Sequence, residues 1–188
     1  KLRVPFDGEW YVVGGGRTIS QNYHAASRAQ RFAMDLLVRR DGASHRGDGK
    51  SLEDYFCYGL PVLAPGAGRV IAAVDSLPDQ KIGESDRTHP AGNHVMIDLG
   101  HDEYVVLAHL QPGSLAVAVG DVVKPGQLLG RCGNSGNTSE PHLHVHLQNS
   151  PKPLEGDGLP AFFEGVLVDG RRVKRTELVR GATVAHAK

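Results

Sequence analysis

The chain has 188 residues, with 21 Lys and Arg against 21 Asp and Glu, so its formal net charge is zero. That balance gives no electrostatic argument for a nucleic-acid or membrane-surface partner. A hydrophobic fraction of 40% is typical of a globular chain. No apolar run approaches the roughly 20 residues that span a bilayer. The chain starts Lys1-Leu2-Arg3 and does not have the pattern of a signal peptide.

Short apolar runs broken by Gly, Pro, Asn and Asp predict β-strands in preference to helices. Helix is expected only as a short turn near Ser51–Tyr55. The fold class is therefore all-β, a folded barrel-sandwich of short antiparallel strands with little helix. In chain order the expected strands are Glu9–Val13, Arg31–Arg39, Pro61–Leu63, Gly68–Val74, Asn93–Leu99, Glu103–His109, Leu128–Cys132 and His142–Gln148.

Two long polar stretches and the C-terminal part complete the expected organisation. Asp41–Lys50 and Asp75–Gly92 are expected to be loops that form the walls of a cleft. Near the C-terminus, Asp169-Gly170 between Gly165–Val168 and Arg171–Lys174 predicts a two-residue hairpin. We expect a single domain over residues 1–188, with its core at about 24–150 and a β extension at about 151–188.

The sharpest local pattern is a run of three histidines at every second position. Successive strand residues point to opposite faces, so His142, His144 and His146 share one face of their strand. The residues between them are Leu143, Val145 and Leu147, which predict an apolar face packed on the core. Such a strand is a rigid mount for metal ligands.

Two further polar side chains stand out on predicted strands. Asp35 lies among small and apolar residues, where a carboxylate needs a partner, either a metal or an ordinary salt bridge. His109 ends its strand beside a turn. Two histidines and one carboxylate satisfy the usual pattern of a catalytic zinc site with an open water position. Cys57 and Cys132 are either a pair in an exported protein or two buried thiols, and the sequence leaves both readings open.

Several motifs together resemble the lysostaphin-type (LytM-like) zinc metallopeptidases. Pro141-His142-Leu143-His144 matches their His-x-His signature, and Gly133–Thr138 before it is a typical turn. The segment Gly120–Gly130 resembles the family's hairpin, and Val62–Val70 its early strand pair. Arg31-Phe32-Ala33-Met34-Asp35 resembles one branch of the family.

The resemblance implies a site residue by residue. His24, Asp35 and His144 would hold one Zn²⁺ per chain, and His109 and His142 would flank the metal-bound water. Ten residues separate His24 from Asp35, against three in the best-known members, so His45 is the alternative first ligand.

The resemblance also bears on His146 and on the reaction that the site would catalyse. His146 stands where many members carry Glu and is expected only to line the site. The implied activity is metal-assisted hydrolysis of peptide bonds in bacterial peptidoglycan, at cross-links or stem peptides. Either His109 or His142 would take the proton of the water, and the other would stabilise the oxyanion or protonate the leaving amine.

Two other classes of function remain open. A catalytically inactive cell-wall-binding or amidase-activating module of the same fold is the main alternative. A carrier domain is the second, because Val122–Gly130 also resembles biotinyl and phosphocarrier hairpins. For the peptidase, the resemblance implies peptidoglycan peptides as partners and an exported, periplasmic or extracellular location. We expect the protein to be a monomer.

Overall fold

Thirteen β-strands supply most of the regular structure in residues 1–187, the part of the chain that this computed structural model describes. Helix is limited to two 3-10 turns, η1 (Tyr23–Ala26) and η2 (Leu52–Asp54). Within these residues, no helix is long and apolar enough to cross a membrane. The strands are β1 (Glu9–Gly14), β2 (Met34–Leu37), β3 (Pro61–Leu63), β4 (Gly68–Val74), β5 (Asn93–Asp98), β6 (Tyr104–Leu110), β7 (Val122–Val123), β8 (Leu128–Arg131), β9 (Leu143–Gln148), β10 (Gly158–Leu159), β11 (Phe163–Val168), β12 (Arg171–Thr176) and β13 (Thr183–His186).

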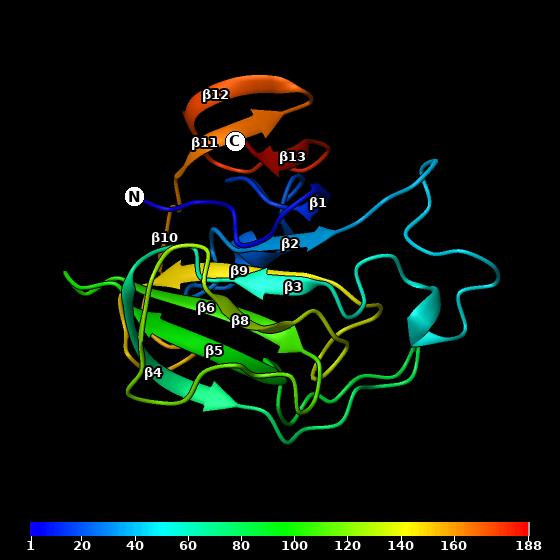
Figure 1. The fold of residues 1–188 in the computed structure, drawn as a ribbon, viewed down its shortest axis with the longest axis horizontal. Helices are drawn as coiled ribbons and strands as arrows, with labels where there is room; N and C mark the ends of the chain where they lie inside the picture. The colour runs from blue at the N-terminus through cyan, green and yellow to red at the C-terminus, as the bar shows by residue number, and fades with distance from the viewer. Residues whose placement is uncertain (188) are drawn as a thin grey trace.

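Eleven strands form one antiparallel sheet in the order β12-β11-β13-β1-β2-β9-β6-β5-β4-β7, with β10 paired to β9. Figure 1 shows this sheet from β4 at the bottom of the view to β12 at the top. The order is a linear path, so the sheet does not close into a barrel within residues 1–187. β3 and β8 form a second, two-stranded sheet, which meets the end of β6 through a bridge between Leu110 and Cys132.

The all-β prediction is confirmed, and the central strand β9 shows how the sequence produces it. Leu143, Val145 and Leu147 pack into the main apolar core on one face, as the period-two pattern predicts. Each such burial contributes roughly 1.5–3 kcal/mol. The opposite face is also buried, although it carries His144 and His146. A strand in the middle of the sheet therefore holds polar side chains inside the molecule.

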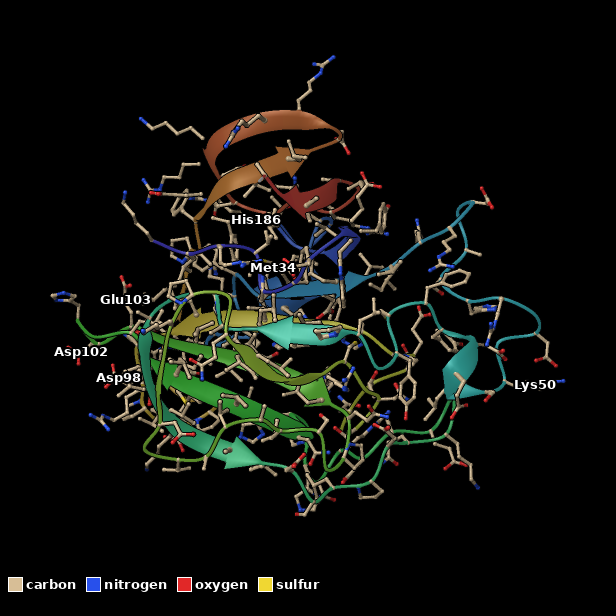
Figure 2. The ribbon with its side chains drawn as sticks, viewed as in Figure 1. Met34, Lys50, Asp98, Asp102, Glu103 and His186 are labelled. Atoms are coloured by element: carbon tan, nitrogen blue, oxygen red, sulfur yellow. The ribbon has the colours of Figure 1, made fainter. Side chains whose placement is uncertain are left out.

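The strand predicted at Arg31–Arg39 is shorter in the structure. β2 covers only Met34–Leu37, because a turn with a hydrogen bond from Ala33 N to Gln30 O precedes it. All four of its residues are buried, and Figure 2 shows Met34 in the interior of the molecule. Asp35 therefore lies on a short, fully buried strand.

The C-terminal strands continue the large sheet beyond β1. β13 pairs with both β1 and β11, and β12 forms the edge. The predicted hairpin is present: Asp169 and Gly170 both have positive φ, 48° and 76°, as a type I′ turn requires.

Three short strands are not among the strands expected from apolar patterning. The two-residue strands β7 and β10 exist only through their pairing with β4 and β9. The third, β13, is a four-residue strand held between two longer ones. Such strands form because they pair with segments that are distant in the sequence, so their own local pattern does not predict them.

Candidate metal centre

Strand pairing brings Asp35 and His144 together although 109 positions separate them in the sequence. β2 and β9 are antiparallel neighbours, and Asp35 lies directly opposite His144 in their register. The Oδ1 atom of Asp35 is 2.9 Å from Nδ1 of His144. Both side chains are almost fully buried, at 3% and 4% exposure. The two residues form the rigid half of the candidate centre.

The third member, His24, comes from the η1 turn, and Asn22 fixes that turn. The Asn22 side chain accepts a hydrogen bond from the His24 backbone N–H and donates to the backbone carbonyls of Gly16, Arg31 and Ala33. These bonds tie the turn to the start of β2. They place His24 Nε2 2.9 Å from the second carboxylate oxygen, Oδ2, of Asp35.

The three side chains offer a donor set that suits zinc. One ligand atom from each of His24, Asp35 and His144 lies within 4.8 Å of the other two. Two imidazole nitrogens and one carboxylate oxygen are ligands that zinc takes in catalytic sites, where a fourth position stays open. The fallback ligand His45 lies elsewhere: its ring is 5.2 Å from the ring of Tyr55 and tilted against it, and its Nδ1 faces the carbonyl of Arg46.

His109 reaches the centre through an irregularity in the sheet. Ala108 and His109 of β6 together oppose His94 of β5, and His109 has a positive φ of 62°. Such a bulge re-aims a side chain. The Nδ1 atom of His109 is 2.8 Å from the Ser135 carbonyl oxygen, which only accepts, so Nδ1 carries the proton. In the neutral ring, Nε2 is therefore a free base.

His142 comes immediately before β9 and is held in the same way. Its Nδ1 atom is 2.8 Å from the Glu140 carbonyl oxygen, so Nδ1 donates and Nε2 faces the centre. Nε2 is 3.6 Å from Oδ1 of Asp35. The rings of His109 and His142 lie 4.7 Å apart. The structure thus brings together all five residues predicted for the site, and two of them are imidazoles with a free Nε2.

The electrostatic state of the centre follows from its burial and its neighbours. Burial alone would raise the pKa of Asp35, but the surrounding imidazoles, that of His142 first, hold this pKa well below its ordinary value. Burial, together with the neighbouring His142 and His144, holds the pKa of His109 well below its ordinary value. At neutral pH the carboxylate is charged and the His109 ring is neutral.

Sequence reasoning missed two residues of the centre, Asn22 and Tyr23. The Tyr23 hydroxyl donates to Oδ2 of Asp35 over 2.6 Å. Burial, followed by the charge of Asp35, raises the pKa of Tyr23 far above its ordinary value, so the hydroxyl keeps its proton. The proximity of Tyr23 to His24 in the sequence was the only signal that could have found it.

A cleft made of several hollows runs past the three candidate ligands on both sides. Tyr23 lines three adjoining hollows, one beside His109 and His144 and two beside His142. The predicted wall Asp75–Gly92 contributes Gly83, Ser85, Pro90 and Ala91 to these hollows.

The other predicted wall, Asp41–Lys50, does not line these hollows. Its Lys50 borders a separate hollow with Glu53 and Asp79. Figure 2 shows Lys50 at the outer end of that loop. Cys57 and Cys132 are both buried free thiols.

An all-β fold that presents two imidazoles and a carboxylate beside two further imidazoles has the make-up of a metal-dependent hydrolase. The sequence matches the profile of Peptidase family M23 over residues 52–155, more than half of the chain. The chain therefore belongs to Peptidase family M23.

Curated relatives agree with this family. Peptidoglycan DD-endopeptidase ShyA of Vibrio cholerae is 33% identical over 156 residues, which cover 79% of this chain and 32% of ShyA. Endolysin 2638A of Staphylococcus phage 2638A is 35% identical over 89 residues, 47% of this chain and 18% of the endolysin. The chain thus spans about a third or less of the length of these relatives.

The fold also resembles that of a solved structure. A candidate glycyl-glycine endopeptidase, LytM, of Ruminococcus gnavus superposes with a TM-score of 0.50 at 18% identity, covering 84% of this chain and 56% of that one. At that identity the likeness concerns the fold alone.

Proposed function

We propose that this chain is a zinc-dependent endopeptidase that hydrolyses peptide bonds in bacterial peptidoglycan, at cross-links or in stem peptides. The observation that carries the proposal is the convergence of His24, Asp35 and His144 within 4.8 Å, beside two imidazoles with free Nε2 atoms. Membership of Peptidase family M23 and the similarity to ShyA, a peptidoglycan DD-endopeptidase, support the substrate class.

The residues of the centre have distinct tasks in this reaction. His24, Asp35 and His144 would hold one zinc ion, which supplies a Lewis acid that makes water nucleophilic at neutral pH. The Nε2 atom of His109 or His142 takes a proton from the attacking water, and that ring then carries a proton at Nε2 that it can pass on. The other ring supports the developing oxyanion or gives a proton to the leaving amine only in its form protonated at Nε2, so the two rings act in opposite protonation states. Both rings are held through Nδ1, so proton transfer at Nε2 needs no reorientation.

The cleft supports a peptide as the substrate. It passes the ligands on both sides, with Tyr23 between its parts and Asn137 in its wall. An extended peptide would lie along it with the scissile bond over the ligands. Because peptidoglycan lies outside the cytoplasm, we also propose that the protein acts after export.

Zinc analysis and wall digestion test the proposal together. The purified protein should hold one zinc per chain, and His144→Ala should lose it, whereas His89→Ala should keep it because His89 is an exposed partner of Asp86. Digestion of purified cell walls, followed by mass spectrometry of the fragments, should show peptide-bond cleavage that chelation abolishes. Absence of zinc-dependent cleavage from all wall types would contradict the proposal.

The same measurements separate the two alternatives. An inactive wall-binding or amidase-activating module would sediment with the walls and release no fragments. A carrier domain would bind no stoichiometric zinc and would carry a covalent group detectable by intact mass.

A further inference from the structure

The buried amide of Gln148 has only one orientation that satisfies its neighbours. Its Nε2 atom is 2.6 Å from the carbonyl oxygens of both Ser150 and Lys152, which only accept. Its Oε1 atom is 3.0 Å from the backbone N–H of Leu154. A flipped amide would set its oxygen against two carbonyls and its NH₂ against an N–H. The Gln148 oxygen therefore points at the next residue in the chain of contacts, His146.

That orientation dictates where the protons of the next two rings lie. His146 Nε2 is 2.9 Å from Gln148 Oε1, so Nε2 of His146 carries the proton and donates it. In the neutral ring, Nδ1 of His146 is then an acceptor. It lies 2.9 Å from Nε2 of His144, so His144 donates from Nε2. All three residues are buried, at 3% exposure or less for the whole residue, and bulk water does not compete for these bonds.

The remaining ring nitrogen of His144 is the one that faces the candidate metal centre. With the proton on Nε2, Nδ1 of the neutral ring carries only a lone pair, and it lies 2.9 Å from the carboxylate oxygen of Asp35. Two acceptors at that distance repel each other unless a cation lies between or beside them. The network therefore presents a ready-made pair of ligands.

We propose that His146 and Gln148 are positioning residues that hold His144 in the tautomer with a bare Nδ1. The proposal rests on the proposed function, since it concerns the ligand role of His144. The sequence led us to expect that His146 only lines the site, whereas here it orients the ligand His144 through a hydrogen bond. Outer partners of this kind fix the orientation and tautomer of metal-binding histidines, and their loss typically lowers metal affinity about 10–100-fold.

Substitutions of His146 can separate this role from simple packing. His146→Leu fills the same space with an apolar side chain but removes the nitrogen that accepts the hydrogen bond from His144. His146→Asn keeps an acceptor, because Asn Oδ1 occupies the place of the histidine Nδ1. His94→Leu is the matched control, since His94 is a largely buried histidine bonded to the Gly92 carbonyl. Gln148→Met removes the acceptor one step further back.

The first readout is the zinc dissociation constant, measured by competition with a chromophoric chelator. We expect His146→Leu and Gln148→Met to weaken zinc binding about 10–100-fold. His146→Asn and His94→Leu should stay within about threefold of the wild type, because each keeps the tautomer of His144. Unchanged affinity in folded His146→Leu, or failure of His146→Asn to restore it, would overturn the proposal.

The second readout is ¹⁵N nuclear magnetic resonance of the zinc-loaded wild-type protein. A nitrogen–nitrogen coupling across the hydrogen bond should join His144 Nε2 to His146 Nδ1, with the proton on His144. A proton on His146 Nδ1 would overturn the proposal. The same spectrum can be recorded without zinc, so a wild type that binds no zinc would refute the proposed function while the tautomer is still decided.

Discussion

Asp35 is the residue on which the contacts of the centre converge. Each carboxylate oxygen faces a ring nitrogen at 2.9 Å, and Tyr23 donates to Oδ2 as well. The side chain is only 3% exposed. A buried charge of this kind persists only when its surroundings compensate for lost hydration. The single carboxylate therefore sets the charge of the whole centre.

Asp35→Asn should remove that charge with little change in shape. We expect zinc affinity to fall by at least about 100-fold, because a metal-binding carboxylate becomes a neutral amide. Isothermal titration with zinc measures the change. Asp157→Asn is the control, since Asp157 is an exposed partner of Arg28. Equal affinities of the two variants would exclude Asp35 as a ligand.

His109→Ala and His142→Ala should separate catalysis from metal binding. Each variant should keep its zinc, because neither side chain belongs to the three-residue ligand set. Each should lower kcat on a peptidoglycan fragment by about 10²–10⁴-fold, the usual contribution of a general acid or base. Loss of zinc from either variant would instead place that histidine among the ligands.

At the level of single residues, the sequence was sufficient to predict which side chains share one face of a strand. The period-two pattern placed His142, His144 and His146 on one face, and its apolar neighbours indicated that Asp35 needs a partner. The choice of Asp35 and His144 as ligands came from the family resemblance. Asn22 acts through bonds to three carbonyls spread over residues 16–33, and no local pattern carries that information. The network behind His144 was equally hidden, because its bond directions depend on the backbone after Ser150.

Among the elements, the turn before His142 and the strand that carries His109 are coupled through Gly92. Gly92 has a φ of 57°, and a Cβ at this position would overlap the carbonyl group of Ser135. That carbonyl accepts the Nδ1 proton of His109. The absence of a side chain at residue 92 therefore lets the Ser135 loop approach closely enough to hold the His109 ring.

Gly92→Ala should disturb the His109 ring from a distance. We expect the free energy of unfolding to fall by about 2–4 kcal/mol, because backbone strain adds to overpacking. Activity should fall about tenfold or more, since small misplacements of a catalytic group are costly. Denaturant titration and peptidoglycan turnover check the two effects.

Gly100→Ala is the matched control for this substitution. Gly100 also has a positive φ, 84°, but a Cβ there meets nothing within 4 Å, and the residue lies away from the cleft. Its cost should be limited to about 1–2 kcal/mol of backbone strain, with no loss of activity. Similar activity in both variants would contradict a role for the Gly92–Ser135 contact.

The elements were predictable where a strand carries its own pattern. Pro61–Leu63 and Gly68–Val74 were predicted with the boundaries that β3 and β4 have. β2 was overpredicted at both ends, because Arg31 and Arg39 lie outside the buried segment. Apolar patterning identifies a strand, but its ends depend on where partners stop pairing.

For the whole molecule, polar groups occupy part of the interior that apolar residues would otherwise fill. The buried polar residues include His109, His142, His144, His146 and Gln148. The all-β class was predictable from turn residues and short apolar runs. The open sheet order was not, because it depends on pairings such as β1 with β13, between opposite ends of the chain.

This interior should make stability depend on pH. Burial, followed by the proximity of His144, lowers the pKa of His146 to about 3. The unfolded chain, with a histidine pKa near 6.5, then binds more protons than the folded one below about pH 6.5. Stability is therefore fully present above that pH and is lost as the pH falls towards 3.

Between about pH 7 and pH 4, His146 should account for a loss on the order of 3 kcal/mol in the zinc-free protein. His146→Asn should be less stable than the wild type at neutral pH or equal to it, but its stability should fall less steeply with acid. Urea titrations at a series of pH values measure both slopes. Parallel slopes would show that His146 does not carry the effect.

The segment between β9 and β10 connects two properties that protein engineers usually treat as separate. Ser150, Lys152 and Leu154 lock the Gln148 amide through their backbones, while the Leu154 side chain lines the cleft. With the role proposed for Gln148, we expect that grafting a different loop here to change substrate preference also alters the affinity for zinc. Variants of this loop should therefore be compared for both zinc affinity and substrate preference, because a variant that binds zinc weakly loses activity on every substrate and can be mistaken for one with altered specificity.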